Sequence, residues 1–196
     1  SDVCSSDLQL WNALLFIARD AEQPSVLFSC DKSKLPEMYQ TDNDYATILR
    51  FAIRSALIDA VKIEGSLDED DIDDIAGQAV DLGSVPIIVI RADQGAKADE
   101  LVQKMESRWD LEAKTFELAV PVQTKEDIQA LEDAAKAFHE AHHDATVIPH
   151  PIGKIAKEAM LQGQTFGAPL LYTTDGEETE TLPTSTAIHK LLHPEE

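Results

Sequence analysis

The sequence predicts an α/β fold with a doubly wound, mostly parallel sheet. Strand-like apolar runs alternate along the chain with single helical segments of about 10–18 residues, which is the pattern of strand–helix–strand units. The strongest strand, 85–90 (VPIIVI), is apolar at every position, as expected for a central parallel strand covered on both faces. No apolar run approaches the roughly 20 residues that cross a bilayer, so we expect no membrane span.

Three helices and one further strand are predicted before the strand at 85–90. Residues 10–22 carry leucine, isoleucine and alanine at helical spacing, and Gln23-Pro24 ends that helix. A short apolar strand follows at 25–30. Apolar residues at helical spacing then predict a helix over 45–61. The third helix is acid-rich and reaches about Leu82.

The ends of that third helix have clear signals. Ser66 or Asp68 is its candidate N-cap, and the acids of its first turn suit the positive end of the helix dipole. Gly83 is placed to end it as the C′ residue.

The remaining elements are predicted as a helix at 97–108, a strand at 115–122, a helix at 124–142, a strand at 145–148, a helix at 152–162, a strand at 170–172 and a short C-terminal helix.

Composition indicates one globular domain over residues 9–196. Apolar residues make up 43% of the chain and charged residues 27%, which are values of folded proteins. Residues 1–8 (SDVCSSDL) resemble translated sequencing-adapter read-through and are expected to be an artefactual tail. Cys30 is then the one cysteine of the domain, which indicates a free thiol in a reducing compartment such as the cytoplasm.

The charge of the chain disfavours one class of partner. Sixteen Lys and Arg face 37 Asp and Glu, for a net charge of −21. A field of this sign repels phosphate backbones, and no basic cluster offsets it, so direct nucleic-acid binding is not expected.

Candidate site residues follow three predicted strands. Asp31 follows the first strand, residues 91–96 (RADQGA) follow the central one, and Pro149 with His150 follows the fourth. Ligands of open parallel sheets bind beyond these carboxyl ends. An acid beside a glycine can hold a metal-bound water next to a phosphate. The alternative is that Asp93 and Gly95 form only the turn into the next helix.

The order of the elements resembles the ParA/MinD-like P-loop ATPases, which include partition ATPases and plasmid-transfer relatives. SVLFSCD stands where that family has a strand ending in its first switch aspartate. VPIIVIRADQGAKADEL stands where a D-x-G-A strand end forms the second switch, and ATVIPHPIGKIAKEAMLQGQ is like the late strand and helix that flank the bound base.

The resemblance implies an ATP- and Mg²⁺-dependent switch. Asp31 would position the attacking water and Mg²⁺, Asp93 would hold the outer shell of the metal, Gly95 would admit the γ-phosphate, and Pro149 would border the base. The glycine-rich phosphate loop would fall at or before Leu8, where the chain has none, so we expect this chain to bind ATP poorly or not at all. The family also implies a protein partner or a homodimer.

Residues 139–143 (HEAHH) offer a second interpretation, a zinc metallopeptidase. H-E-x-x-H on a helix places two histidines, His139 and His143, on one face for zinc, with Glu140 as the general base. Glu158 is a conceivable third ligand. The alternative is that these histidines interact with the helix dipole and solvent at the end of a helix.

A third interpretation is a thioredoxin-like or glutathione-transferase-like domain. Residues 166–169 (FGAP) before the predicted strand 170–172 resemble the G-x-P loop of that fold. The chain has no C-x-x-C, so a redox role would lack its pair of thiols. This interpretation requires strands 25–30 and 170–172 to be neighbours in the sheet.

Overall fold

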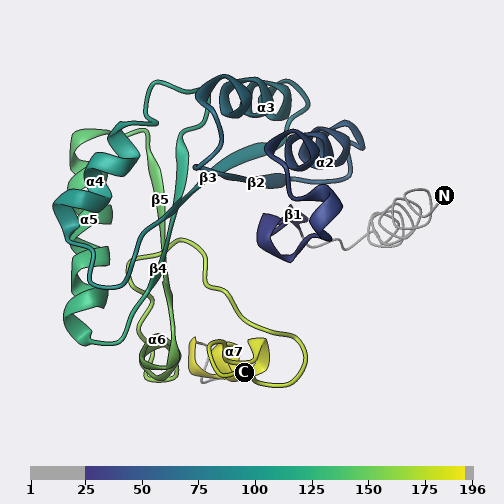
Figure 1. Ribbon diagram of the computed structural model, residues 1–196. Helices are drawn as coiled ribbons and strands as arrows, with labels where there is room; N and C mark the ends of the chain where they lie inside the picture. Colours follow the sequence, from purple (N-terminus) through teal and green to yellow (C-terminus); the bar gives the residue numbers. More distant parts are fainter. Residues whose placement is uncertain (1–24, 193–196) are drawn as a thin grey trace.

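The computed structural model describes residues 25–192 and is built around one parallel sheet (Figure 1). Five strands lie in the order of the sequence, each hydrogen-bonded in parallel to the next. Their bounds are β1 Leu27–Phe28, β2 Ala60–Glu64, β3 Val85–Arg91, β4 Thr115–Pro121 and β5 Thr146–Ile152.

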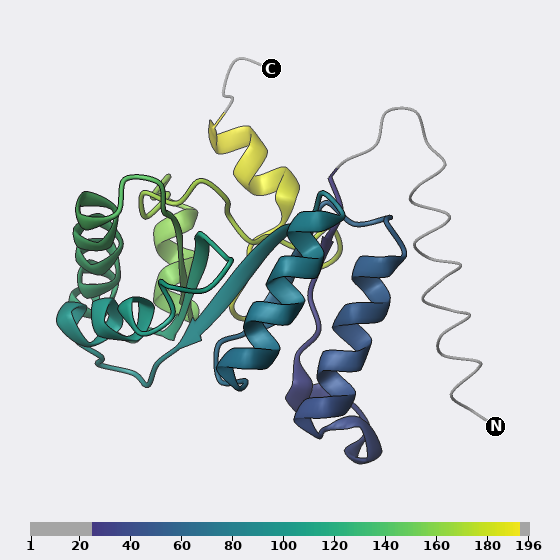
Figure 2. The same ribbon diagram turned by 90° about the horizontal axis from the view of Figure 1, so that it is seen from above.

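Helices connect the strands and cover one side of the sheet. The α-helices are α2 Asp42–Arg54, α3 Glu69–Asp81, α4 Ala98–Glu106, α5 Lys125–Ala141, α6 Lys154–Met160 and α7 Ser185–Leu192, and the 3₁₀ helices are η1 Lys32–Lys34 and η2 Glu37–Tyr39. Figures 1 and 2 show α2 to α5 along the convex side of a curved sheet, while the segment after α6 returns along the concave side. None of the described helices is both long and apolar enough to cross a membrane.

The two faces of the sheet have different side chains because strand residues alternate between faces. The convex face packs into the main apolar core with the helices through Val61, Ile63, Ile88, Ile90, Phe116, Leu118, Val120 and Val147. The register places the intervening residues together on the concave face: Lys62, Glu64, Ile87, Val89, Arg91, Glu117, Ala119, Ile148 and His150. The concave face therefore combines apolar residues with charged ones.

The α/β class with a parallel sheet is confirmed, but the doubly wound arrangement is wrong. A doubly wound sheet reverses its strand order at a switch point and carries helices on both faces. Here the order β1-β2-β3-β4-β5 never reverses, and α2 to α5 share one face. Sequential parallel strands with helices outside are the arrangement of α/β barrels.

Most element bounds agree with the predictions. Strand 85–90 is the buried central strand β3, Asp68 caps α3, and Gly83 follows that helix with φ +80°. Helix 124–142 is α5, with Thr124 and Asp127 forming a capping box at its start. The predicted helix 10–22 and the tail 1–8 lie outside the described residues.

The main error is that the predicted helix 45–61 extends too far and that the strand at its end was not predicted. Helix α2 ends at Arg54, Ala56 takes a left-handed conformation with φ +54°, and β2 begins at Ala60. The sequence of β2, AVKIE, alternates apolar and polar residues as a strand does.

Two differences concern the C-terminal third. Strand β5 continues through Pro149 and Pro151 to Ile152, which is tolerated because within the described sheet β5 pairs only with β4. The predicted strand 170–172 is not formed, and among the described strands β1 pairs only with β2. The neighbouring strands that a thioredoxin-like fold requires are therefore not present among the described residues.

Gly153 sets the close approach of the chain after β5 to the end of β4. It has φ +146°, and a Cβ at this position would lie 2.6 Å from the carbonyl oxygen of Val122. We expect Gly153→Ala to lower the free energy of unfolding by about 1–3 kcal/mol, because strain and backbone overlap combine. Urea unfolding followed by circular dichroism measures it.

The matched control is Gly77→Ala in α3, where a Cβ would meet no atom within 4 Å. This change is expected to raise the free energy of unfolding by about 0.5–1 kcal/mol, because alanine has the better helix propensity. Equal effects of the two substitutions would contradict the steric role of Gly153.

Candidate active site

A cluster of four polar side chains, one buried and three partly buried, lies on the concave face. At its centre is Glu117 of β4, whose exposed fraction is only 2%. The Lys62 ammonium of β2 lies 2.6 Å from Glu117 Oε2, and His150 Nδ1 of β5 lies 2.8 Å from Oε1. The Tyr172 hydroxyl, from the segment after α6, donates to Oε2 at 2.5 Å. We call these four residues the Glu117 cluster.

The rings of the Glu117 cluster are packed together. The imidazole of His150 and the ring of Tyr172 have centroids 4.1 Å apart and an interplanar angle of 34°. The Lys62 Nζ lies 4.0 Å from the centroid of the Tyr172 ring, within cation–π range. Each member thus contacts at least one other besides Glu117.

The electrostatics of the cluster favour an ionised Glu117. Burial by itself raises the pKa of this carboxyl, but the hydrogen bond from His150 and the charge of Lys62 outweigh burial and lower the pKa to about 2. Burial and the nearby Glu117 charge raise the pKa of Tyr172, so its hydroxyl stays a donor at neutral pH.

A cavity of about 500 Å³ lies at the carboxyl ends of β1 to β3. It is lined by Asp31, Lys32, Ser33, Gln40, Glu64, Ser66 and Arg91. Arg91 is bidentate to Glu64, with Nε 2.9 Å from Oε2 and a terminal nitrogen 2.6 Å from Oε1. About half of the Arg91 side chain is exposed, so its guanidinium is accessible from the cavity.

The sheet register relates this cavity to the Glu117 cluster. Arg91 is in register with Ala119, which is in register with His150, so these residues form one row on the concave face. Two strand spacings place the backbones of Arg91 and His150 about 10 Å apart.

Of the residues predicted from the sequence, Asp31 lies at this cavity. It caps η1 through hydrogen bonds from Ser33, which lower the pKa of its carboxyl against the effect of burial. Pro149 is buried in β5 beside His150. Asp93 and Gly95 are exposed and form the turn before α4, in which Gly95 has φ +79°. Their placement agrees with the alternative of a simple turn.

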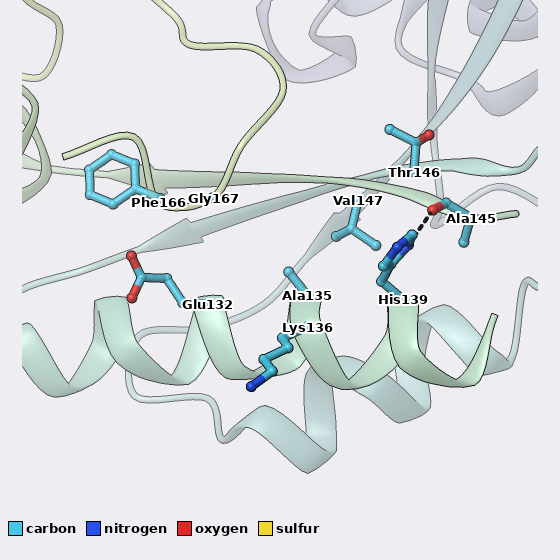
Figure 3. A pocket seen from close by; sticks show the side chains of 9 residues that line it. All are labelled: Glu132, Ala135, Lys136, His139, Ala145, Thr146, Val147, Phe166 and Gly167. Atoms are coloured by element: carbon cyan, nitrogen blue, oxygen red, sulfur yellow. Dashed lines mark hydrogen bonds between the residues drawn. The ribbon is translucent and has the colours of Figure 1, made fainter. Parts of the chain in front are cut away.

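The H-E-x-x-H motif does not form a zinc site. Helix α5 ends at Ala141, so His143 lies beyond the helix, and Nδ1 of His139 donates to the carbonyl of Ala145 at 3.0 Å. Figure 3 shows His139 at a hollow of about 470 Å³ beside α5, with its ring turned toward Ala145. Among the described residues no group of three His, Cys, Asp or Glu side chains could hold a metal ion, and Glu140 and Glu158 form only loose ion pairs with lysines.

Comparison with known proteins identifies the family. The family model of type I 3-dehydroquinase matches residues 3–195. The chain belongs to the type I 3-dehydroquinase family. Curated 3-dehydroquinate dehydratases from Salmonella, including those of Salmonella paratyphi B and Salmonella heidelberg, are 28% identical over 134 residues, which are 67% of this chain and 53% of theirs. The chain thus spans about half the length of the curated relatives it matches.

Solved structures of the same family share the fold. The type I 3-dehydroquinate dehydratase from Clostridium difficile, solved with covalently modified comenic acid, aligns with a TM-score of 0.77 at 19% identity, over 94% of this chain and 75% of that one. The 3-dehydroquinate dehydratase from Enterococcus faecalis gives 0.68 at 16% identity, over 94% and 77%. At these identities the likeness concerns the fold alone.

The family assignment overturns the interpretation as a ParA/MinD-like P-loop ATPase. ATP and Mg²⁺ are not cofactors of a type I 3-dehydroquinase, and neither plasmid partition nor conjugal transfer is its process. The zinc metallopeptidase and thioredoxin-like interpretations are wrong for the same reason. The switch and base-binding roles of Asp31, Asp93, Gly95 and Pro149 rested on that resemblance and lose their basis. A protein partner or homodimer, the absence of nucleic-acid binding, and a cytoplasmic location stay predictions.

Sequence reasoning reached part of the site. Of the predicted site residues only Asp31 lies here; Arg91 and His150 stood in segments noted at strand ends but had no predicted role. Lys62, Glu64, Glu117 and Tyr172 were missed. Lys62 and Glu64 lie just beyond the predicted helix 45–61, in β2, and no strand was predicted there. Glu117 had a visible signal, because it is the one charged residue in the strand TFELAVP. An ionisable residue in an otherwise buried strand is paired or functional.

The ion pair of Glu117 with Lys62 should contribute to the free energy of unfolding. Glu117→Gln removes the charge partner of the buried Lys62 ammonium, so we expect the free energy of unfolding at pH 7 to fall by about 3–5 kcal/mol. Chemical denaturation at a series of pH values measures this difference.

The sign of the pH dependence follows from the lowered pKa of Glu117. Its stabilising contribution is fully present above the ordinary value of 4.5 and is lost as pH falls from there toward 2. The difference between wild type and Glu117→Gln should therefore shrink over that range. A difference that stays constant between pH 5 and pH 2 would contradict the ionised state assigned to Glu117.

Proposed function

We propose that this chain catalyses the dehydration of 3-dehydroquinate, or of a closely related cyclic hydroxy-ketone acid. The observation that carries the proposal is the match of residues 3–195 to type I 3-dehydroquinase, supported by a polar cluster on the concave face of the barrel-type sheet. The curated relatives are 3-dehydroquinate dehydratases, and in barrel folds active sites lie at the carboxyl ends of the strands.

The reaction removes a proton from the α-carbon of a ketone and a hydroxyl group from the carbon next to it. A base takes the α-proton, the electrons of that C–H bond form the new double bond, and the C–O bond of the neighbouring carbon breaks. The departing hydroxide takes a proton and leaves as water, and the product is a conjugated enone carboxylate. The site therefore needs a proton-transfer group, a cation near the ketone oxygen and a group that binds the carboxylate.

His150 is the proton-transfer group in this proposal. Its Nδ1 is engaged by Glu117, so in the neutral imidazole Nδ1 carries the proton and Nε2 presents a lone pair. This pairing of a carboxylate with an imidazole orients the ring and stabilises the imidazolium that forms when Nε2 takes a proton. The same nitrogen can then return the proton to the leaving hydroxide.

Lys62 supplies the cation near the ketone oxygen. Its side chain is only 12% exposed, and at low dielectric a fixed ammonium acts more strongly on developing negative charge than it would in water. An ammonium has three N–H donors, and Glu117 does not occupy all of them. The Lys62 ammonium can therefore stabilise the negative charge that accumulates on the ketone oxygen as the α-proton leaves.

Arg91 is the group proposed to bind the substrate carboxylate. It lines the cavity at the strand ends, and Glu64 fixes the plane of its guanidinium by two hydrogen bonds. Arginine suits planar recognition of carboxylates. The spacing of about 10 Å between the backbones of Arg91 and His150 lets one ring-sized substrate reach both.

An absorbance assay tests the function. The purified chain is mixed with 3-dehydroquinate, and formation of the conjugated enone is followed in the ultraviolet. We expect His150→Gln to lower kcat by about 10²–10⁴-fold, because it removes the proton-transfer group. Lys62→Met should also lower kcat by at least tenfold, with folding checked by circular dichroism because Glu117 loses its cation.

The chain offers matched controls far from the concave face. His143→Gln changes an exposed histidine, and Lys136→Met changes a lysine on the outer face of α5 with 76% of its side chain exposed. Both should retain full activity. Failure of the wild-type chain to form enone at any concentration would overturn the proposed function, and equal loss in His150→Gln and His143→Gln would overturn the assigned role of His150.

A further inference from the structure

Tyr172 contacts every other member of the Glu117 cluster. Its hydroxyl donates to Glu117 at 2.5 Å, its ring stacks on His150 with centroids 4.1 Å apart, and the same ring lies 4.0 Å from the ammonium of Lys62. The other three members come from strands, whereas Tyr172 comes from the C-terminal segment on the concave side (Figure 1).

We propose that Tyr172 is a positioning residue, through which the C-terminal segment fixes the carboxylate of Glu117 and the imidazole of His150 for proton transfer. The catalytic consequence rests on the proposed function. The positioning itself is a property of the folded chain and is measurable without substrate.

The hydroxyl has a specific task in this arrangement. Glu117 receives Lys62 and Tyr172 at Oε2 and His150 at Oε1, so the two oxygens have different partners and the carboxylate plane is fixed. Without the hydroxyl, Oε2 keeps only the Lys62 ammonium as a partner, and the carboxylate gains freedom to rotate. The orientation of Nδ1–H in His150 depends on that plane.

The ring has a second, separable task. Stacking against one face of His150 restricts rotation of the imidazole, and the negative face of the phenol ring attracts the Lys62 ammonium. Phenylalanine at this position retains the ring contacts and loses the hydrogen bond, whereas leucine loses both the ring contacts and the hydrogen bond. The pair Tyr172→Phe and Tyr172→Leu therefore separates the two contributions.

The segment that carries Tyr172 is held in place by contacts that do not involve Tyr172. Lys157 of α6 forms an ion pair with Glu178 at 2.7 Å and donates to the carbonyl of Thr179. Thr174 and Thr184 form an isolated bridge within the same segment. Replacing the Tyr172 hydroxyl leaves these contacts in place, so Tyr172→Phe is expected to keep its melting temperature within a few degrees.

Nuclear magnetic resonance of the imidazole nitrogens tests the positioning directly. In wild type, the neutral form of His150 should be the Nδ1–H tautomer. We expect Tyr172→Phe to give a mixture of tautomers or exchange-broadened ring signals, and Tyr172→Leu to give the larger change. Tyr39→Phe in η2 is the control and should leave the His150 signals unchanged. His150 signals in Tyr172→Phe identical to wild type would overturn the proposal.

Kinetics test the catalytic consequence. Tyr172→Phe should lower kcat about tenfold with little change in KM, the effect of losing one hydrogen bond to a charged group. Tyr172→Leu should lower kcat further, by about 100-fold. A change in KM alone would overturn a positioning role and indicate substrate contact. If the wild-type chain proves inactive while the tautomer shift is seen, the proposed function fails and the positioning by Tyr172 stands.

Discussion

A buried carboxylate is the constraint on which the concave face depends. Glu117 is 2% exposed in the middle of β4, where an ionised carboxylate without partners would be strongly destabilising. Three donors compensate it, and they come from β2, β5 and the C-terminal segment. The carboxylate therefore ties together parts of the chain that are up to 110 positions apart, from Lys62 to Tyr172. Any change in the curvature of the sheet would pull these donors away from its oxygens.

The one-sided arrangement of the helices explains why such a cluster can exist. Helices α2 to α5 bury the convex face and form the large apolar core, so stability does not require the concave face to be uniformly apolar. In a doubly wound sheet the second face would also be covered by helices, and Lys62, Glu117 and His150 would lie in a helix–sheet interface. A barrel-type sheet instead turns this face toward its interior, where polar groups from several strands converge near the carboxyl ends.

The sequence predicted the local structure better than the global arrangement. Helix α3 with its cap Asp68, helix α5 and the buried strand β3 follow from capping and periodicity, which act over a few residues. Alternating strands and helices are common to doubly wound sheets and barrels, so local pattern cannot distinguish them; strand order does, and it is set by long-range packing. The apolar spacing of α2 continued into β2 through Leu57 and Ile58, which concealed the strand that carries Lys62. Tyr172 gave no signal, because its partners are remote in sequence.

The strong acidity of the chain makes the few cations of the site informative. Only 16 of 196 residues are lysine or arginine, yet Lys62 and Arg91 both lie on the concave face and each is fixed by a buried or largely buried glutamate, Glu117 and Glu64. On an exposed surface such pairs add little to stability, but here each glutamate also restrains the orientation of its cation. The pairing keeps the interior near neutrality and still presents guanidinium and ammonium donors to an anionic ligand. The net charge of −21 repels anions from the rest of the protein, and salt weakens that repulsion by screening exposed charges.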